Sequence, residues 1–185
     1  MPAPAAFAPA LSFPVTGDVI GRFDCEGEEW EIERFSFAGP EAGHAPIRLG
    51  IFASIHGDEP AGTEAAIAFL HLLREQPARA TGYALCLYPV VNPTGFARGT
   101  RENAAGRDLN REFWRGSDQP EVAIIEAELR AQRFDGIITL HADDTCEGHY
   151  GYTHGRAMED ALLRPALLAA ERIFPRDGRA TIDGF

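Results

Sequence analysis

The sequence predicts an α/β fold with a mixed, largely parallel central sheet flanked by helices. Three continuous apolar runs of strand length alternate with helical patterns: "IRLGIFASI", "YALCLYPVV" and "DGIITL". Apolar runs without polar alternation are typical of strands that are covered on both faces, as in parallel sheets. Strands that alternate with helices favour βαβ units. Ahead of these runs, "EEWEIERFSFAG" alternates polar and apolar residues and predicts a half-buried strand.

The predicted helices have recognisable ends. The first follows Pro60 and runs through "AGTEAAIAFLHLLREQ" until Pro77 ends it. The second is "PEVAIIEAELRAQR", with Pro120 in its first turn. The third is "AMEDALLRPALLAAERIF", and we expect Pro165 to kink or split it. Residues 92–116 show no apolar period, so we expect a long functional loop there.

Length and composition fit a single domain with a sizeable core. The chain has 185 residues, of which 45% are hydrophobic and 24% charged, which is ordinary for a globular protein. Its net charge of −11 disfavours nucleic acid or an anionic membrane as a partner. No stretch is apolar enough to span a membrane.

The first residues and the cysteines bear on the cellular location. Residues 1–18 lack a basic region, and prolines break their apolar stretch, so we interpret them as a flexible or capping arm rather than a signal peptide. The chain has three cysteines, an odd and sparse set that favours a reducing compartment. We therefore expect a cytoplasmic protein.

Histidines follow two of the predicted parallel strands. His56 ends the run that includes residues 51–55, and His141 ends the run 136–140. Because ligand sites in open α/β sheets form beyond the carboxyl ends of the strands, both imidazoles should reach one crevice. Glu59 lies three residues after His56. Two imidazoles and one carboxylate form a three-ligand catalytic zinc site, and these ligands suit zinc better than magnesium or calcium.

A plain structural interpretation of these residues stays open. A single histidine at a strand end is more often a structural residue than a ligand, and the H-x-x-E pattern is short enough to occur by chance. The pairing of the two histidines with Glu59 favours the metal site.

A second informative stretch is "NPTGFARGTRENAAGRDLNREFW", residues 92–114. It concentrates arginines in an otherwise acidic chain, namely Arg98, Arg101, Arg107 and Arg111. Guanidinium groups bind carboxylates in bidentate geometry, and near a metal they can stabilise an oxyanion. The amide of Asn110 could contact the same carboxylate. The alternative is a solvated basic loop that pairs with the protein's own acids.

In this order, "HGDE", "NPTG", "TRENAAGRDLNR" and the strand that ends in His141 resemble the zinc metallocarboxypeptidase family, including its succinylglutamate desuccinylase/aspartoacylase branch. The resemblance spans about half of the chain, residues 50–141. It implies a zinc carboxypeptidase-like fold and a Zn²⁺ ion held by His56, Glu59 and His141.

The resemblance also implies roles for the arginine-rich stretch. Arg101 matches the arginine that polarises the scissile carbonyl, and Asn110 and Arg111 match the pair that holds a terminal carboxylate. The implied activity is hydrolysis of an amide bond in a small peptide or an N-acyl amino acid with a free carboxylate. The spacing of "TRENAAGRDLNR" is more similar to the carboxypeptidase and murein-peptide amidase branch, whereas "SIHGDEPAG" is equally similar to the deacylase branch.

One family feature has no match in this sequence. Family enzymes carry a glutamate, the general base, well beyond the third ligand, and residues 142–185 hold no recognisable counterpart. We expect that the sequence lacks its natural C-terminal part; the alternative is a non-catalytic metal- or carboxylate-binding relic. An unclosed sheet would favour association into a homo-oligomer. Asp143 or Asp144, just past the third ligand, is expected to orient a ligand.

Overall fold

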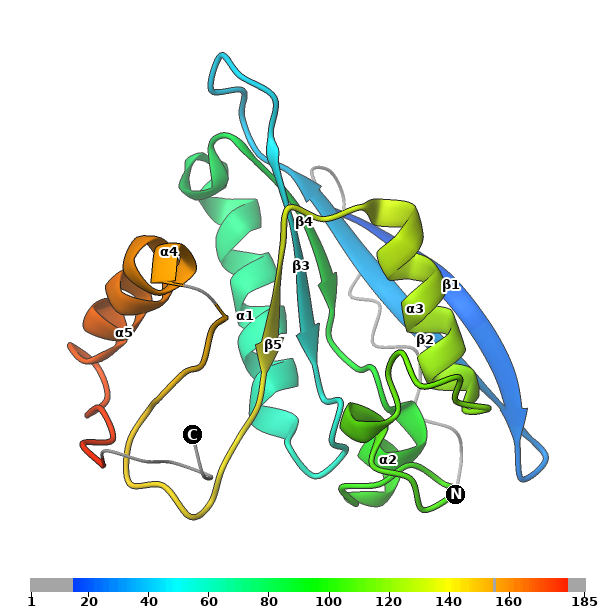
Figure 1. The fold of residues 1–185 in the computed structure, drawn as a ribbon. Coiled ribbons are helices and arrows are strands. Elements are labelled where there is room, and N and C mark those ends of the chain that lie inside the picture. Colours follow the sequence, from blue (N-terminus) through cyan, green and yellow to red (C-terminus); the bar gives the residue numbers. More distant parts are fainter. Residues whose placement is uncertain (1–14, 155, 180–185) are drawn as a thin grey trace. The chain divides into compact units, whose positions relative to one another are not determined.

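A computed structural model describes residues 15–154 and 156–179, which form two compact units that divide between Ala142 and Asp143 (Figure 1). The first unit contains a five-stranded sheet in the order β1-β2-β4-β3-β5. Its strands are β1 (Val15–Cys25), β2 (Glu28–Ala38), β3 (Ile47–Ala53), β4 (Tyr83–Tyr88) and β5 (Gly136–Leu140).

The mixed α/β fold class is confirmed. Strand β3 pairs in parallel with β4 and with β5, and these are the three apolar runs of the sequence. Strands β4, β3 and β5 therefore form the parallel part of the sheet, which extends from the centre of the sheet to the edge at β5. The other half of the sheet is antiparallel, because β1 and β2 form a long hairpin and β2 runs against β4.

Helices cover both faces of the sheet. In Figure 1, α1 (Pro60–Glu75) lies on one face and α3 (Pro120–Gln132) on the other. Successive side chains of β3 alternate between the two cores, as the strand period requires. Ile51 and Ala53 belong to the core that contains Leu70 of α1. Phe52 belongs to the core that contains Val122 of α3. The strand that precedes His56 is therefore held from both sides.

Strand β5 differs from the expectation of a strand covered on both faces. Ile137 and Ile138 are 57% and 45% exposed. Among the described strands β5 pairs only with β3, at the edge of the sheet. The apolar run therefore predicted strand β5 correctly, but it wrongly predicted that both faces of this strand are buried.

The expectation that residues 1–18 form an arm was wrong for residues 15–18, because these begin strand β1. Val15 is 1% exposed and pairs with Phe37. Strand β1 is stabilised by its hairpin partner, which lies further along the chain. The proline-rich residues ahead of Val15 therefore gave no indication of this strand. Residues 1–14 lie outside the described residues.

The segment 92–116 is more ordered than expected for a loop. It contains α2 (Pro93–Arg98) and the short 3₁₀ helix η2 (Leu109–Arg111). The Asn92 side chain accepts a hydrogen bond from Gly95 N at 2.9 Å and so caps α2 at its N-terminus. Gly99 ends the helix in a left-handed conformation. A further 3₁₀ helix, η1 (Pro77–Ala80), follows α1.

The second unit contains the third predicted helical stretch. It is divided into α4 (Arg156–Met158), the π-helical turn η3 (Glu159–Leu163) and α5 (Arg164–Ala170). Pro165 stands at the start of α5, because it has no N–H to continue the preceding helix. The expected kink or split at Pro165 appears only as a change from π-helical to α-helical hydrogen bonding, because the backbone stays helical at Leu163 and Arg164. Across the described parts of both units, every helix is too short or too polar to cross a membrane.

Candidate metal centre

The ends of two neighbouring strands and one helix bring three polar side chains together. Ala53 of β3 and Leu140 of β5 are paired in parallel, so the residues that follow them leave the sheet side by side. His141 follows β5 directly, and His56 comes three residues after the end of β3. Glu59 is the N-cap residue of α1.

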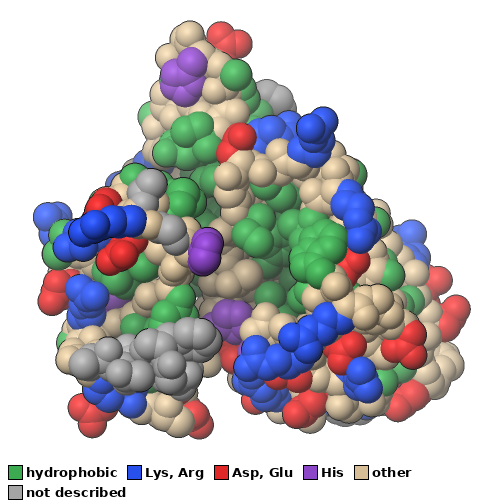
Figure 2. Space-filling view, viewed as in Figure 1, with side chains coloured by type: hydrophobic (Ala, Val, Ile, Leu, Met, Phe, Trp, Pro, Cys, Tyr) green, Lys and Arg blue, Asp and Glu red, His purple; other side chains and the backbone are tan. Residues whose placement is uncertain are grey.

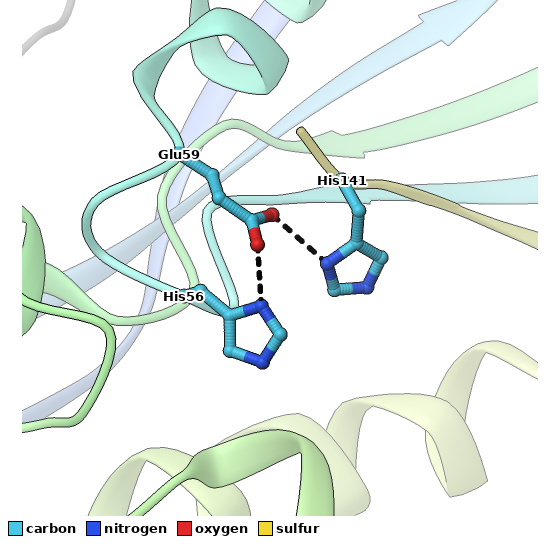
Figure 3. Close-up of side chains that lie close together, drawn as sticks. All are labelled: His56, Glu59 and His141. Atoms are coloured by element: carbon cyan, nitrogen blue, oxygen red, sulfur yellow. Dashed lines mark hydrogen bonds and ion pairs between the residues drawn. The ribbon is translucent and has the colours of Figure 1, made fainter. Parts of the chain in front are cut away.

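The three side chains converge on one point (Figure 3). His56 Nδ1 lies 2.7 Å from Glu59 Oε1, and His141 Nδ1 lies 2.9 Å from Glu59 Oε2. One ligand atom from each residue lies within 4.8 Å of the other two. His56 and Glu59 are 3% and 6% exposed, whereas the His141 side chain is 31% exposed. The site is thus buried on the strand side and accessible through His141.

The charges of the three donor residues favour the binding of a cation. Burial would raise the pKa of Glu59, but hydrogen bonds with His141 and His56 and from the Ala142 N–H outweigh it and hold the pKa at about 2. The carboxylate is therefore ionised at neutral pH. It faces two imidazole nitrogens, and two imidazoles with one carboxylate are the donor set of a catalytic zinc site. The residues present fit the metal that the sequence predicts.

The loop that carries His56 is held by close backbone contacts. A Cβ on Gly57 would lie 2.0 Å from the backbone carbon of Gly95 in α2, so only glycine allows this approach. Ser54, at φ 46°, turns the chain after β3. Its hydroxyl donates to Glu59 O at 3.2 Å and lies 2.7 Å from Thr63 Oγ1. These contacts fix the spacing between His56 and Glu59.

Asp108 joins the metal centre to the arginine-rich segment. Its Oδ1 lies 3.1 Å from His56 Nε2, and its Oδ2 accepts hydrogen bonds from Arg101 Nε and Nη2 at 3.3 and 3.2 Å. Burial opposes ionisation of Asp108, but His56 and Arg101 together lower its pKa. If the proton of His56 sits on Nε2, Nδ1 offers its lone pair to a cation. Asp108 thus orients the imidazole.

The sequence predicts that Asp143 or Asp144 orients a ligand. It does not identify Asp108 for this role. Asp143 instead accepts hydrogen bonds from Thr145, Cys146 and Tyr150 within the second unit. The available signal was an acid in the arginine-rich segment, two residues before Asn110.

The structure brings Arg101 to the three donor residues, with Nη1 3.8 Å from Glu59 Oε1. Asn110 and Arg111 follow Asp108 on η2, and the Asn110 N–H donates to Asp108 Oδ1 at 3.0 Å. Both side chains are exposed, and among the described residues neither bonds to the metal centre. In Figure 2, basic side chains, all of them arginine in this chain, lie close to one of the histidines on the face in view.

Replacing Asp108 by asparagine is expected to weaken zinc binding. The amide cannot accept from both His56 and Arg101 as the carboxylate does. Loss of a partner that orients a ligand typically weakens metal binding by about 10–100-fold. Chelator competition measures the change. The control is Glu112→Gln, because Glu112 pairs with Arg107 in the same segment. Equal zinc affinity of Asp108→Asn and the parent protein would contradict the assignment.

Comparison with known proteins agrees with this geometry. The model of the succinylglutamate desuccinylase/aspartoacylase catalytic domain matches residues 46–162, which is more than half of the chain. The chain belongs to this family. The matched region contains the three donor residues and the whole arginine-rich segment, so the resemblance inferred from the sequence is confirmed.

Individual relatives of this family member are carboxypeptidases and metallopeptidases. Human carboxypeptidase D is 30% identical over 110 residues, which is 50% of this chain and 8% of that protein. The structure of a candidate metallopeptidase from Shewanella denitrificans is 27% identical, with a TM-score of 0.64 over 92% of this chain and 63% of that one. A metallo-carboxypeptidase from Pseudomonas aeruginosa is 25% identical, with a TM-score of 0.55 over 75% of this chain and 40% of that one. The chain therefore spans only part of the length of these relatives.

Proposed function

We propose that this chain binds one Zn²⁺ ion through His56, Glu59 and His141 and hydrolyses an amide bond in a substrate with a free carboxylate. The observation that carries the proposal is the convergence of these three donors, within 4.8 Å of one another, with Arg101 beside them. When bound, zinc supplies Lewis-acid activation of water and of a carbonyl oxygen.

The residues around the donors have separate tasks in this proposal. Arg101 points its guanidinium at the edge of the site and stabilises the negative charge that develops on the carbonyl oxygen. Asp108 keeps both Arg101 and His56 in place. Arg111 and Asn110 bind the substrate carboxylate, which orients the amide for attack. Support for Arg111 comes from its exposed side chain on η2, the 3₁₀ helix that Asp108 caps.

Two substrate classes fit the site. Family membership favours an N-acyl amino acid, and the carboxypeptidase relatives favour a peptide with a free C-terminus. The Pseudomonas metallo-carboxypeptidase was solved in complex with (2-guanidinoethylmercapto)succinic acid, a compound with two carboxyl groups. A carboxylate is common to all three, and this is the group that we assign to Arg111.

A substrate panel tests the function. Zinc-loaded protein is incubated with N-acyl aspartate, N-acyl glutamate and short peptides, with and without a free carboxylate. The described residues include no group that we assign as general base, so slow turnover is expected and the comparison is with the His56→Ala variant. Zinc-dependent release of product from a carboxylate substrate supports the proposal. Equal rates for the parent and the variant on every substrate would contradict it and favour the non-catalytic alternative.

Replacing Arg111 by alanine is expected to remove the preference for a free carboxylate. Loss of a hydrogen bond to a charged group costs roughly 1.5–3 kcal/mol, which is about tenfold or more in affinity or in kcat/KM. Calorimetric titration with an N-acyl amino acid and with its amidated analogue measures the preference without turnover. The matched control is Arg115→Ala, another exposed arginine four residues further on. If Arg111→Ala weakens both ligands equally, Arg111 does not bind the carboxylate.

A further inference from the structure

A buried carboxylate on helix α3 lies outside the metal centre. Glu121 stands in the first turn of α3 and is 1% exposed. Both of its oxygens lie 3.3 Å from Asn103 Nδ2, and Oε1 accepts from Thr94 Oγ1 at 3.4 Å. Burial raises the pKa of Glu121 even though these hydrogen bonds oppose the rise. The groups that act on Glu121 are hydrogen-bond donors and include no described cation, so these hydrogen bonds must offset the cost of burial.

The main partner of Glu121 closes a tight turn. Asn103 is 6% exposed, and its Oδ1 accepts hydrogen bonds from the N–H groups of Ala105 and Arg107 at 3.1 and 3.0 Å. The Asn103 N–H donates to Arg107 O at 3.0 Å. Because Oδ1 is engaged by the turn, Nδ2 is the group that faces α3, where it also donates to Gln119 Oε1 at 2.8 Å. Asn103 therefore anchors the turn 103–107 to the helix.

Both ends of this turn lead into the metal centre. Asp108 follows the turn directly, and Arg101 precedes it by two residues. The Arg101 carbonyl accepts from Gly57 N and from Asn92 Nδ2, each at 3.4 Å, which ties it to the loop of His56. A displacement of Asn103 thus moves the two side chains that contact His56 and Glu59.

We propose that Glu121 is a positioning residue of the metal centre. Its carboxylate holds the 103–107 turn through Asn103, and the turn sets the places of Arg101 and Asp108. The part of this inference that concerns Arg101 in hydrolysis rests on the proposed function. The part that concerns the orientation of His56 by Asp108 does not.

The test compares three variants. Glu121→Met fills a similar volume but removes both acceptors, and a buried methionine should leave the protein folded. Glu121→Gln keeps one acceptor oxygen and should restore most of the parent behaviour. Glu128→Met is the matched control, because Glu128 lies on the same helix with its side chain 11% exposed but pairs with Arg34 and Tyr88.

Three readouts distinguish positioning from stability. In Glu121→Met we expect faster amide hydrogen exchange at Ala105 and Arg107, and zinc binding weaker by about tenfold, as when a partner of a ligand is displaced. The rate constant kcat should fall by roughly 10–100-fold with little change in KM, since a displacement of about 1 Å can cost 10²-fold. Glu128→Met should lower the melting temperature and leave all three readouts unchanged.

Exchange and zinc affinity do not require turnover, so they test Glu121 even if the proposed hydrolysis fails. Exchange rates and zinc affinity of Glu121→Met within twofold of the parent would overturn the inference. Equal changes in Glu128→Met would also overturn it, because they would show a general effect of stability.

Discussion

The His56→Ala variant is expected to lose its zinc and, with it, any amide hydrolysis. His56 is the most deeply buried of the three donors, and its Nδ1 faces Glu59 at 2.7 Å. Removing a ligand should cost more than the ~10–100-fold loss that follows removal of a ligand's neighbour. Elemental analysis after dialysis should find about one zinc per parent chain, as for a site with three protein ligands, and little zinc in the variant.

His71→Ala is the matched control for this experiment. His71 lies in α1, twelve residues after Glu59, which is about 18 Å along the helix at ~1.5 Å per residue. Its replacement should leave zinc content and hydrolysis unchanged. Full zinc retention in His56→Ala would remove the basis for the metal site.

The second large effect is expected from Arg101→Ala, which should lower kcat. This variant should retain more of its zinc affinity than Asp108→Asn does. The guanidinium lies at the edge of the site, with Nη1 3.8 Å from Glu59. Loss of a single oxyanion donor typically lowers kcat by about 10²–10³-fold. Asp108 keeps its bond to His56 when Arg101 is removed, so the imidazole stays oriented.

The control for Arg101 is Arg98→Ala, an arginine of the same segment that pairs with Glu26. Steady-state rates on the best carboxylate substrate, together with chelator competition, separate the two effects. A rise in KM at constant kcat would show that Arg101 binds the substrate rather than the transition state.

The three donor residues could be predicted from the sequence because each is tied to the end of an element. His56 and His141 follow apolar runs, and Glu59 directly precedes the proline that starts α1. The parallel register of Ala53 with Leu140 then brings both histidines to one edge. Their geometry in the structure agrees with the predicted set, and their role as zinc ligands stays a prediction until the metal is measured.

Asp108 and Glu121 could not be predicted, for different physical reasons. The position of Asp108 depends on how residues 99–108 fold back, which follows from the contacts of Arg101 with Gly57 and Asn92. Glu121 stands in the first turn of a helix, where an acid is normally solvated and stabilised by the helix dipole. Its burial results from Asn103 and Thr94, which reach it from a separate segment.

The most direct test of the metal centre is the zinc K-edge X-ray absorption spectrum of the protein loaded with one equivalent of zinc. We expect a first shell of nitrogen and oxygen at about 2.0–2.2 Å, with outer scattering from two imidazole rings and from only one ring in His141→Ala. Three cysteines are free in the structure, namely Cys25, Cys86 and Cys146. A sulfur shell at about 2.3 Å, or the absence of bound zinc, would contradict a site formed by His56, Glu59 and His141.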